Sequence, residues 1–275
     1  MRDFLLFTYY APIAAFGQVA VGEVRGSWER PGKSAILGLL AAGLGLARDD
    51  AEGQAALAEA YGYAVRTDAP GKPLSDYHTA QTAPRNAFKN GPPASRAEVL
   101  AASKINTILS RRAYRTDSLF TVALWEAAPS PHWPLVELAE ALKHPHYQPY
   151  AGRKACPFAL PLAPTLVQAD TLGQAFAGRP PWPEDLPLDR FDDGEEPRKR
   201  LAGWNVPWSR EVAYDAGAPA ALTEGLKPIQ SRQRRDRIAD RPRWQFAWRD
   251  EAIASLPDAS TEPPPEETTS AETAP

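Results

Sequence analysis

The sequence predicts an α+β fold of the ferredoxin-like kind, because strand and helix patterns alternate along its first half. Their order is strand, helix, strand, a long excursion, strand and helix, which is a βαβ unit repeated with insertions. At 275 residues the chain can form one elaborated domain or two small ones. This topology serves many functions, so function has to be argued from individual residues.

Each predicted element follows from its side chains. The aromatic and apolar run Phe4–Tyr10 predicts a strand. The segment Ser34–Ala47 predicts a helix, with Ser34 as its N-cap and glycines close to its end. The remaining predictions are helices at Ala51–Ala60 and Pro134–Lys143 and strands at Tyr61–Thr67 and Leu119–Trp125.

Charge is distributed unevenly along the chain. The tail 257–275 holds five acidic residues and no basic one, so without it the net charge would change from −3 to +2. The stretch 184–196 adds seven acidic residues against one arginine. Basic residues collect in the excursion 76–116 and again at 232–243. Because a polyanion responds to local patches, these two basic segments are candidates for binding one. The tail itself is predicted to be disordered.

Composition also excludes several classes of protein. The single Cys156 excludes an internal disulfide and a cysteine-rich zinc site, which fits a reducing, cytoplasmic setting. Polar residues and Pro12 interrupt the apolar N-terminus, so it does not predict a signal peptide. The apolar run 35–46 is well short of the roughly twenty residues that span a bilayer. We therefore expect a soluble, cytoplasmic protein without membrane contact.

The triplet Gly32-Lys33-Ser34 invites comparison with a phosphate-binding loop. That loop needs its first glycine at position 27, which is Ser27 here, so an ATPase is disfavoured. Lys33 at the start of a helix, with Arg25 and Arg30 nearby, still predicts an anion site. A basic loop that merely begins a helix explains the pattern equally well.

Two further motifs suit nucleic-acid binding. "RRAYRTD" at Arg111–Asp117 places guanidinium groups for phosphates beside Tyr114, whose ring can stack on a base, although a solvated charge run has the same pattern. "YAGRKACPFALPL" at Tyr150–Leu162 adds a glycine and two cations. We interpret its cysteine as a small buried thiol rather than a nucleophile.

The histidines are weaker candidates. "DYHTAQ" brings Asp76 close to His78, which suggests acid/base chemistry, but no serine nucleophile motif accompanies them. His144 and His146 flank a proline without a nearby acidic or thiolate ligand, so loop histidines are favoured over a metal site.

Taken in order, five blocks resemble the CasD family of the type I-E CRISPR surveillance complex, Cascade. The blocks are "GEVRGSWERPGKSAILGLLAAGLGLARDD", "DYHTAQ", "RRAYRTDSLFTVALW", "HPHYQPYAGRKACPFALPL" and "WQFAWRDE". The resemblance implies a modified ferredoxin-like, RRM-like fold of the RAMP (repeat-associated mysterious protein) kind, with a protruding thumb and a smaller C-terminal portion. The implied divisions are 1–75 with 117–165 for the ferredoxin-like domain, 76–116 for the thumb and 166–256 for the C-terminal portion. The acidic insertion 179–197 within that portion and the disordered tail 257–275 follow from composition and depart from the family pattern.

The resemblance also implies a function. In type I-E complexes this subunit is not the processing nuclease, so we expect no enzyme activity, cofactor or metal here; family members bind and cap the 5′ handle of the CRISPR RNA (crRNA). They contact the backbone subunit CasC and the large subunit CasA, and they meet target DNA through the assembled complex. The RNA contacts implied for this sequence are Arg25, Lys33 and Ser34 at the helix start, His78, Arg111, Arg112 and Tyr114 in the arms of the thumb, and Gly152, Arg153, Lys154 and Cys156 in the third segment.

Two alternatives remain open. In the first, the protein is a metal-independent endoribonuclease that cuts the repeat RNA, with His78 as general acid/base and Lys104 and a tyrosine nearby. In the second, it is an interaction scaffold that binds no RNA.

Overall fold

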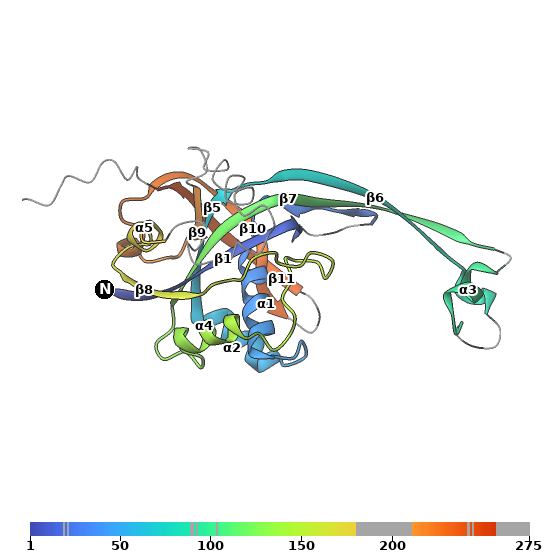
Figure 1. Ribbon diagram of the computed structural model, residues 1–275, viewed down its shortest axis with the longest axis horizontal. Coiled ribbons are helices and arrows are strands. Elements are labelled where there is room, and N and C mark those ends of the chain that lie inside the picture. The colour runs from blue at the N-terminus through green and yellow to red at the C-terminus, as the bar shows by residue number, and fades with distance from the viewer. Residues whose placement is uncertain are drawn as a thin grey trace, which may run out of the picture.

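The computed structural model describes residues 1–256, except for 19, 21, 89, 90, 92, 103, 180–210, 241, 242 and 244. Almost all of the predicted acidic insertion 179–197 and the whole tail 257–275 therefore lie outside the described residues. The described chain has a mixed α/β fold that consists mostly of antiparallel sheet with few helices (Figure 1).

The large sheet has the order β10-β11-β9-β5-β7-β1-β8, and β3 and β6 also pair with β7. Every pairing in it is antiparallel except that of β3 with β7. Its strands are β1 (Arg2–Ala14), β3 (Val24–Arg25), β5 (Tyr61–Ala69), β6 (Lys72–Thr82), β7 (Asn106–Glu126), β8 (Thr165–Ala169), β9 (Glu211–Asp215), β10 (Lys227–Asp240) and β11 (Gln245–Ser255). A separate small sheet joins β2 (Phe16–Gly17) to β4 (Ser27–Trp28).

The helices are α1 (Lys33–Leu44), α2 (Ala51–Ala60), α3 (Arg96–Leu100), α4 (Leu135–Lys143) and α5 (Leu172–Ala177), with short 3-10 turns at Arg85–Ala87 and Ala220–Leu222. Helices α1, α2 and α4 cover one face of the sheet and α5 covers the other (Figure 1). No helix in the described ranges is long and apolar enough to cross a membrane.

Both faces of the central strands are buried, which explains their nearly continuous apolar sequences. In β1, Leu5, Phe7 and Tyr9 pack toward α1 and α4, whereas Phe4 and Leu6 pack toward α5. This alternation follows from the two-residue period of a strand. The strands predicted at Phe4–Tyr10, Tyr61–Thr67 and Leu119–Trp125 are confirmed as parts of β1, β5 and β7.

The helix predictions hold with two corrections, both in α1. Helix α2 has the predicted bounds, and α4 begins one residue after the predicted Pro134. For α1, the predicted N-cap Ser34 is wrong: the N-cap is Gly32, and Ser34 lies inside the helix. The first helical amide, that of Lys33, donates instead to Asp236 of β10 at 2.8 Å, so a distant side chain replaces a local cap. The helix ends at Leu44, three residues before the predicted Ala47, because Gly45 adopts a left-handed conformation, with φ of 77°.

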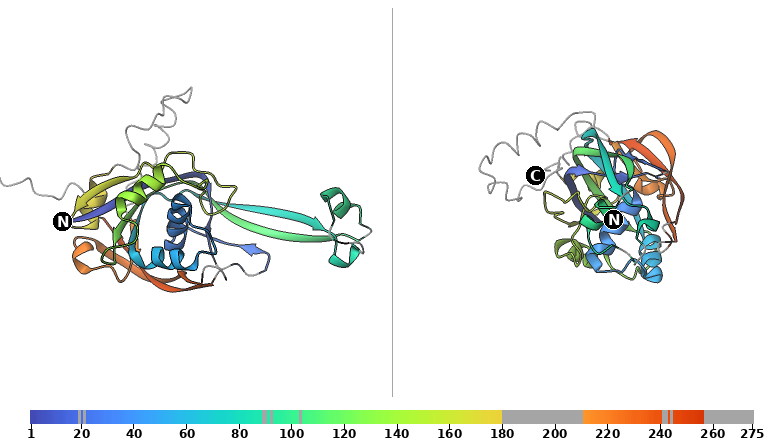
Figure 2. Two further views of the ribbon diagram at one scale, coloured as in Figure 1. Left: turned by 90° about the horizontal axis from the view of Figure 1, so that it is seen from below. Right: turned by 90° about the vertical axis from the view of Figure 1, so that its right-hand side faces the viewer.

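The long excursion is a two-stranded arm. Strand β6 pairs with the first half of β7 from Lys72↔Thr116 to Thr82↔Asn106. Figures 1 and 2 show this ribbon extending away from the body, with α3 near its far end. The second half of β7 is the buried centre of the large sheet. A single strand therefore connects the arm directly to the core.

Candidate nucleic-acid interface

Several predicted site residues meet where the arm leaves the body. Strand β3 runs parallel to β7 with Arg25 beside Arg112, and strand alternation places Tyr114 on the same face as Arg112. Arg153, in the segment after α4, lies over the Tyr114 ring at 4.3 Å from its centroid. Its guanidinium also donates to the carbonyl oxygens of Ala113 at 3.1 Å and Arg25 at 3.3 Å. Arg153 thus fastens three separate segments together, and Arg25, Arg112, Tyr114 and Arg153 form a cationic strip.

The segment that carries Arg153 is shaped by Gly152 and Cys156. Gly152 has φ of 85°, and a Cβ there would overlap the carbonyl oxygen of Ala15, so this position requires glycine. Cys156 is fully buried, its amide donates to the carbonyl of Arg153 at 2.8 Å, and burial raises the pKa of its thiol. The structure confirms the predicted buried thiol, so Cys156 could contact a ligand only through its backbone, whereas the side chain of Lys154 is exposed.

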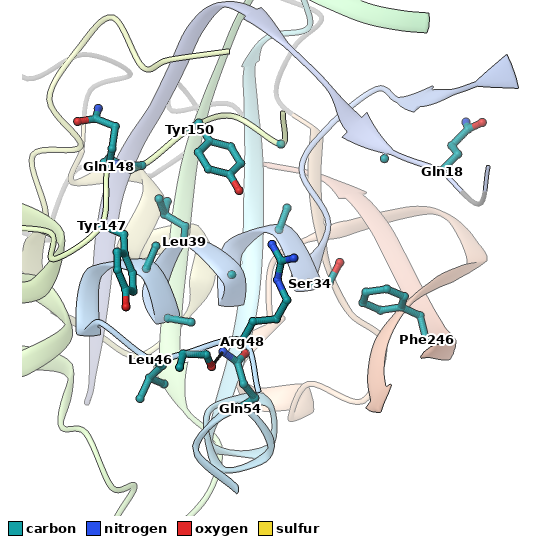
Figure 3. A pocket seen from close by; sticks show the side chains of 18 of the residues that line it. Gln18, Ser34, Leu39, Leu46, Arg48, Gln54, Tyr147, Gln148, Tyr150 and Phe246 are labelled. Atoms are coloured by element: carbon teal, nitrogen blue, oxygen red, sulfur yellow. Dashed lines mark hydrogen bonds between the residues drawn. The ribbon is translucent and has the colours of Figure 1, made fainter. Parts of the chain in front are cut away.

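Beside the strip lies a groove of about 900 Å³ along α1 (Figure 3). Its floor consists of small and apolar residues of α1, such as Gly38 and Leu39. Its walls combine cations, amides and rings from four other parts of the chain: Gln18, Arg25, Arg48, Gln54, Tyr147, Gln148, Tyr150, Gly152, Arg235 and Phe246. Of the predicted residues, Arg25, Ser34 and Gly152 line this groove.

Lys33 points elsewhere. Its ammonium contacts Asp215 at 2.9 Å, and its amide is bonded to Asp236, so the helix N-terminus already holds protein carboxylates. The sequence predicted an anion site at the helix start, and in this structure the anions there are carboxylates of β9 and β10. The structure does not bring Lys33 together with the groove residues.

Those carboxylates belong to an ionic network centred on Arg249. Its guanidinium contacts Asp215 at 2.9 Å, Asp236 at 2.9 Å and Glu251 at 3.1 Å. Glu251 is fully buried; burial alone would raise its pKa, but Arg234, Arg30 and the Tyr63 hydroxyl help to lower it to about 2. The network joins the hairpin of β10 and β11 to the start of α1, and Arg235 and Phe246 of that hairpin form one wall of the groove.

The remaining predicted residues lie farther out or on the other face of the arm. His78 faces the same side of the ribbon as Arg112, and its Nδ1 is 3.6 Å from the Asp76 carboxylate. Arg111 pairs with Tyr77 on the opposite face. Lys104 precedes Asn106, which is itself four residue steps, or about 13 Å, beyond the partner of His78. The endoribonuclease alternative requires His78 and Lys104 to lie close together, and the structure does not bring them together.

The sequence analysis missed several groove residues. Tyr147 and Tyr150 stand within the "HPHYQPYAGRK" block, where aromatic rings beside cations were a usable signal. Arg235 lies in the basic segment 232–243, which was a candidate for polyanion binding, but Arg48 and Phe246 gave no such signal, because their proximity depends on how the chain packs.

Comparison with known proteins places this geometry in a family. Residues 4–250 match the family described as CRISPR-associated protein (Cas_Cas5). The chain is 34% identical over 196 residues to the CRISPR system Cascade subunit CasD of Escherichia coli (strain K12), covering 68% of this chain and 81% of that protein.

Two solved structures share the fold. A chain of a CRISPR RNA-guided surveillance complex superposes with a TM-score of 0.57 at 21% identity, covering 96% of this chain and 95% of that one. A Cas protein crystal structure gives a TM-score of 0.55 at 24% identity, covering 92% and 95%. The motif resemblance, the family match and the curated relative agree, and the chain belongs to the Cas5 family of CRISPR-associated proteins.

Proposed function

We propose that this protein is the CasD-type subunit of a type I-E Cascade and that it binds the 5′ handle of crRNA without cutting it. The observation that carries the proposal is the groove along α1, with arginines and aromatic rings on its walls and the cationic strip of Arg25, Arg112, Tyr114 and Arg153 beside it. The relationship to the Escherichia coli subunit supports the same conclusion.

In this proposal RNA is bound by ionic contacts to its phosphates and by stacking of its bases on aromatic rings. Arginines on the walls and the strip neutralise phosphates, and unpaired bases stack on Tyr147, Tyr150 or Phe246. Ser34, Gly152 and Lys154 offer hydroxyl, backbone and ammonium contacts, whereas the ammonium of Lys33 is already neutralised by Asp215. His78 and Arg111 would serve RNA or protein contacts along the arm.

The finer architecture and the partners belong to the proposal. The body would be a modified ferredoxin-like RAMP domain, and the arm would be the thumb. With CasC along the thumb and CasA nearby, the subunit would anchor both neighbours and meet target DNA only through the assembled complex in the cytoplasm. Exposed apolar residues on the arm, including Leu74, Tyr77 and Ile108, support a role in contacting another subunit.

The test is the affinity of the purified protein for single-stranded RNA carrying its own repeat-derived handle, measured across a salt series. If each of the five arginines on the walls and the strip neutralises one phosphate, the slope of log affinity against log salt should be about −3.5. A flat salt response would refute phosphate binding and favour the scaffold alternative. In a parallel reaction the repeat RNA stays intact; metal-independent cleavage that disappears in His78→Ala would establish the endoribonuclease alternative.

A further inference from the structure

The start of α1 and the tip half of the C-terminal hairpin are joined by direct bonds. Gly32, the N-cap, has no side chain to offer, and Asp236 Oδ2 accepts the Lys33 amide hydrogen at 2.8 Å. A Cβ on Gly32 would overlap that same carboxylate, so the approach of Asp236 depends on this glycine. The Lys33 ammonium adds a second link, to Asp215 of β9 at 2.9 Å.

Arg249 fixes both carboxylates in place. It donates through Nε and Nη2 to the two oxygens of Asp236, at 2.9 and 3.0 Å, and through Nη1 to Asp215 at 2.9 Å. Two parallel bonds between a guanidinium and a carboxylate restrict the orientation of both groups. Side chains of Arg249 and Asp236 are each more than nine-tenths buried, so neither is placed to touch a nucleic acid.

These buried contacts lie one residue away from the groove on both sides. Ser34 follows Lys33 and lines the groove at the start of α1, and Arg235 precedes Asp236 and lines the hairpin wall. Arg235 is itself tied to the hairpin, because its Nε donates to the carbonyl of Phe246 at 2.9 Å. The bond between Lys33 and Asp236 therefore links the start of α1 to the hairpin, one residue from the groove on each side.

We propose that Asp236 and Arg249 are positioning residues that set the width of the RNA groove from behind its walls. The inference rests on the proposed function, since RNA binding in the groove is what they would control. It predicts the direction in which the affinity for RNA changes when Asp236 loses its charge. Removing a carboxylate near a bound polyanion should by electrostatics alone tighten binding by about twofold. Loss of wall alignment should weaken it instead.

The experiment compares Asp236→Asn with Asp250→Asn in the full-length protein. Asp250 lies on the same hairpin but is exposed, so its substitution removes an equal charge without touching the Arg249 network. Two probes are used: single-stranded RNA carrying the repeat-derived handle, and a scrambled RNA of the same composition. Thermal unfolding of each variant is recorded beside the affinities.

We expect Asp236→Asn to bind handle RNA about tenfold more weakly, because its single oxygen cannot accept from the Lys33 amide and from both Arg249 nitrogens, and its NH2 group would face a donor. The preference for handle over scrambled RNA should fall as well, while Asp250→Asn binds at least as tightly as wild type. A general loss of stability would lower the melting temperature without changing that preference. The inference would be overturned if Asp236→Asn bound handle RNA as tightly as Asp250→Asn and kept the wild-type preference for handle over scrambled RNA.

A second variant covers the case in which Asp236→Asn does not fold. Asp215→Asn keeps the helix cap and removes only the Lys33 ammonium partner and one Arg249 contact. It should weaken handle binding in the same direction by a smaller factor, and unchanged or tighter binding would contradict the positioning role. If wild type itself fails to bind handle RNA with a steep salt dependence, the proposed function fails, which separates the two outcomes.

Discussion

Replacing Glu251 by Gln should destabilise the protein strongly, because Glu251 is the buried anion that the C-terminal hairpin shares with the body. Its carboxylate accepts from the Tyr63 hydroxyl at 2.8 Å, Arg232 at 2.9 Å and Arg249 at 3.1 Å, with Arg234 at 3.4 Å. The variant keeps the shape, but Arg232 loses its anion, and Arg234 and Arg249 keep only their ionic contacts with Asp236 and Asp215. Removing one partner of a buried ion pair costs about 3–5 kcal/mol.

Urea unfolding and thermal melting measure this loss. For a chain of this size the expected change corresponds to a melting temperature lower by about 10 °C. The exposed neighbour Asp250, replaced by Asn, is the control and should cost less than about 0.5 kcal/mol. A loss below about 1 kcal/mol in Glu251→Gln would show that the network does not hold the hairpin.

The same variant tests a pH dependence. The pKa of Glu251 is lowered in the folded protein from 4.5 to about 2. A carboxyl group whose pKa is lower in the folded protein than in the unfolded chain stabilises the fold. This stabilisation is complete above the pKa of the unfolded chain and is lost as pH falls through the pKa of the folded protein. The stability difference between wild type and Glu251→Gln should therefore shrink between pH 4.5 and about 2. A difference that stays constant across this window would refute the assignment.

Three further predictions concern the interface. Arg153→Lys keeps the charge but loses the paired hydrogen bonds to the Ala113 and Arg25 carbonyls and the full contact with the Tyr114 ring. Handle RNA should therefore bind about tenfold more weakly in a filter-binding titration. Wild-type affinity would mean that only the charge of Arg153 matters. Arg112→Glu should weaken handle binding and reduce recovery of the assembled complex in a co-purification, and full recovery would remove Arg112 from the interface. Gly152→Ala should cost about 1–3 kcal/mol in urea unfolding, because its positive φ and the Ala15 carbonyl both oppose a side chain, whereas an unchanged midpoint would contradict that geometry.

The sequence predicted the buried parts of the fold because burial leaves a pattern. Strand β5 is buried along its whole length, and the amphipathic spacing of α4 marks its apolar face. Strand β6 was not predicted as a strand, since it packs no face against the core and its eleven residues are largely exposed. Without a buried face there is no periodic signal, and only its pairing with β7 makes it a strand.

The site was predictable where neighbours in sequence are also neighbours in space. Arg112 and Tyr114 share one strand face, and "YAGRK" carries its glycine, cation and rings together. The pairing of Lys33 with Asp236 was beyond reach, because 203 residues separate them and the contact depends on the whole sheet order. A sequence motif can indicate that a helix start binds an anion, but it cannot say which anion the folded chain supplies.

Strand β7 gives the arm an unusual constraint on how its length can change. Because the same strand continues into the centre of the sheet, deleting one residue from its outer half would reverse the facing of every side chain beyond that point. Shortening the ribbon is compatible with the fold only when matching pairs are trimmed from β6 and β7 together. The tip around α3 makes few contacts with the body, so its length can change without matched changes in β6 and β7. Relatives should therefore vary more in length at the tip than along the paired strands.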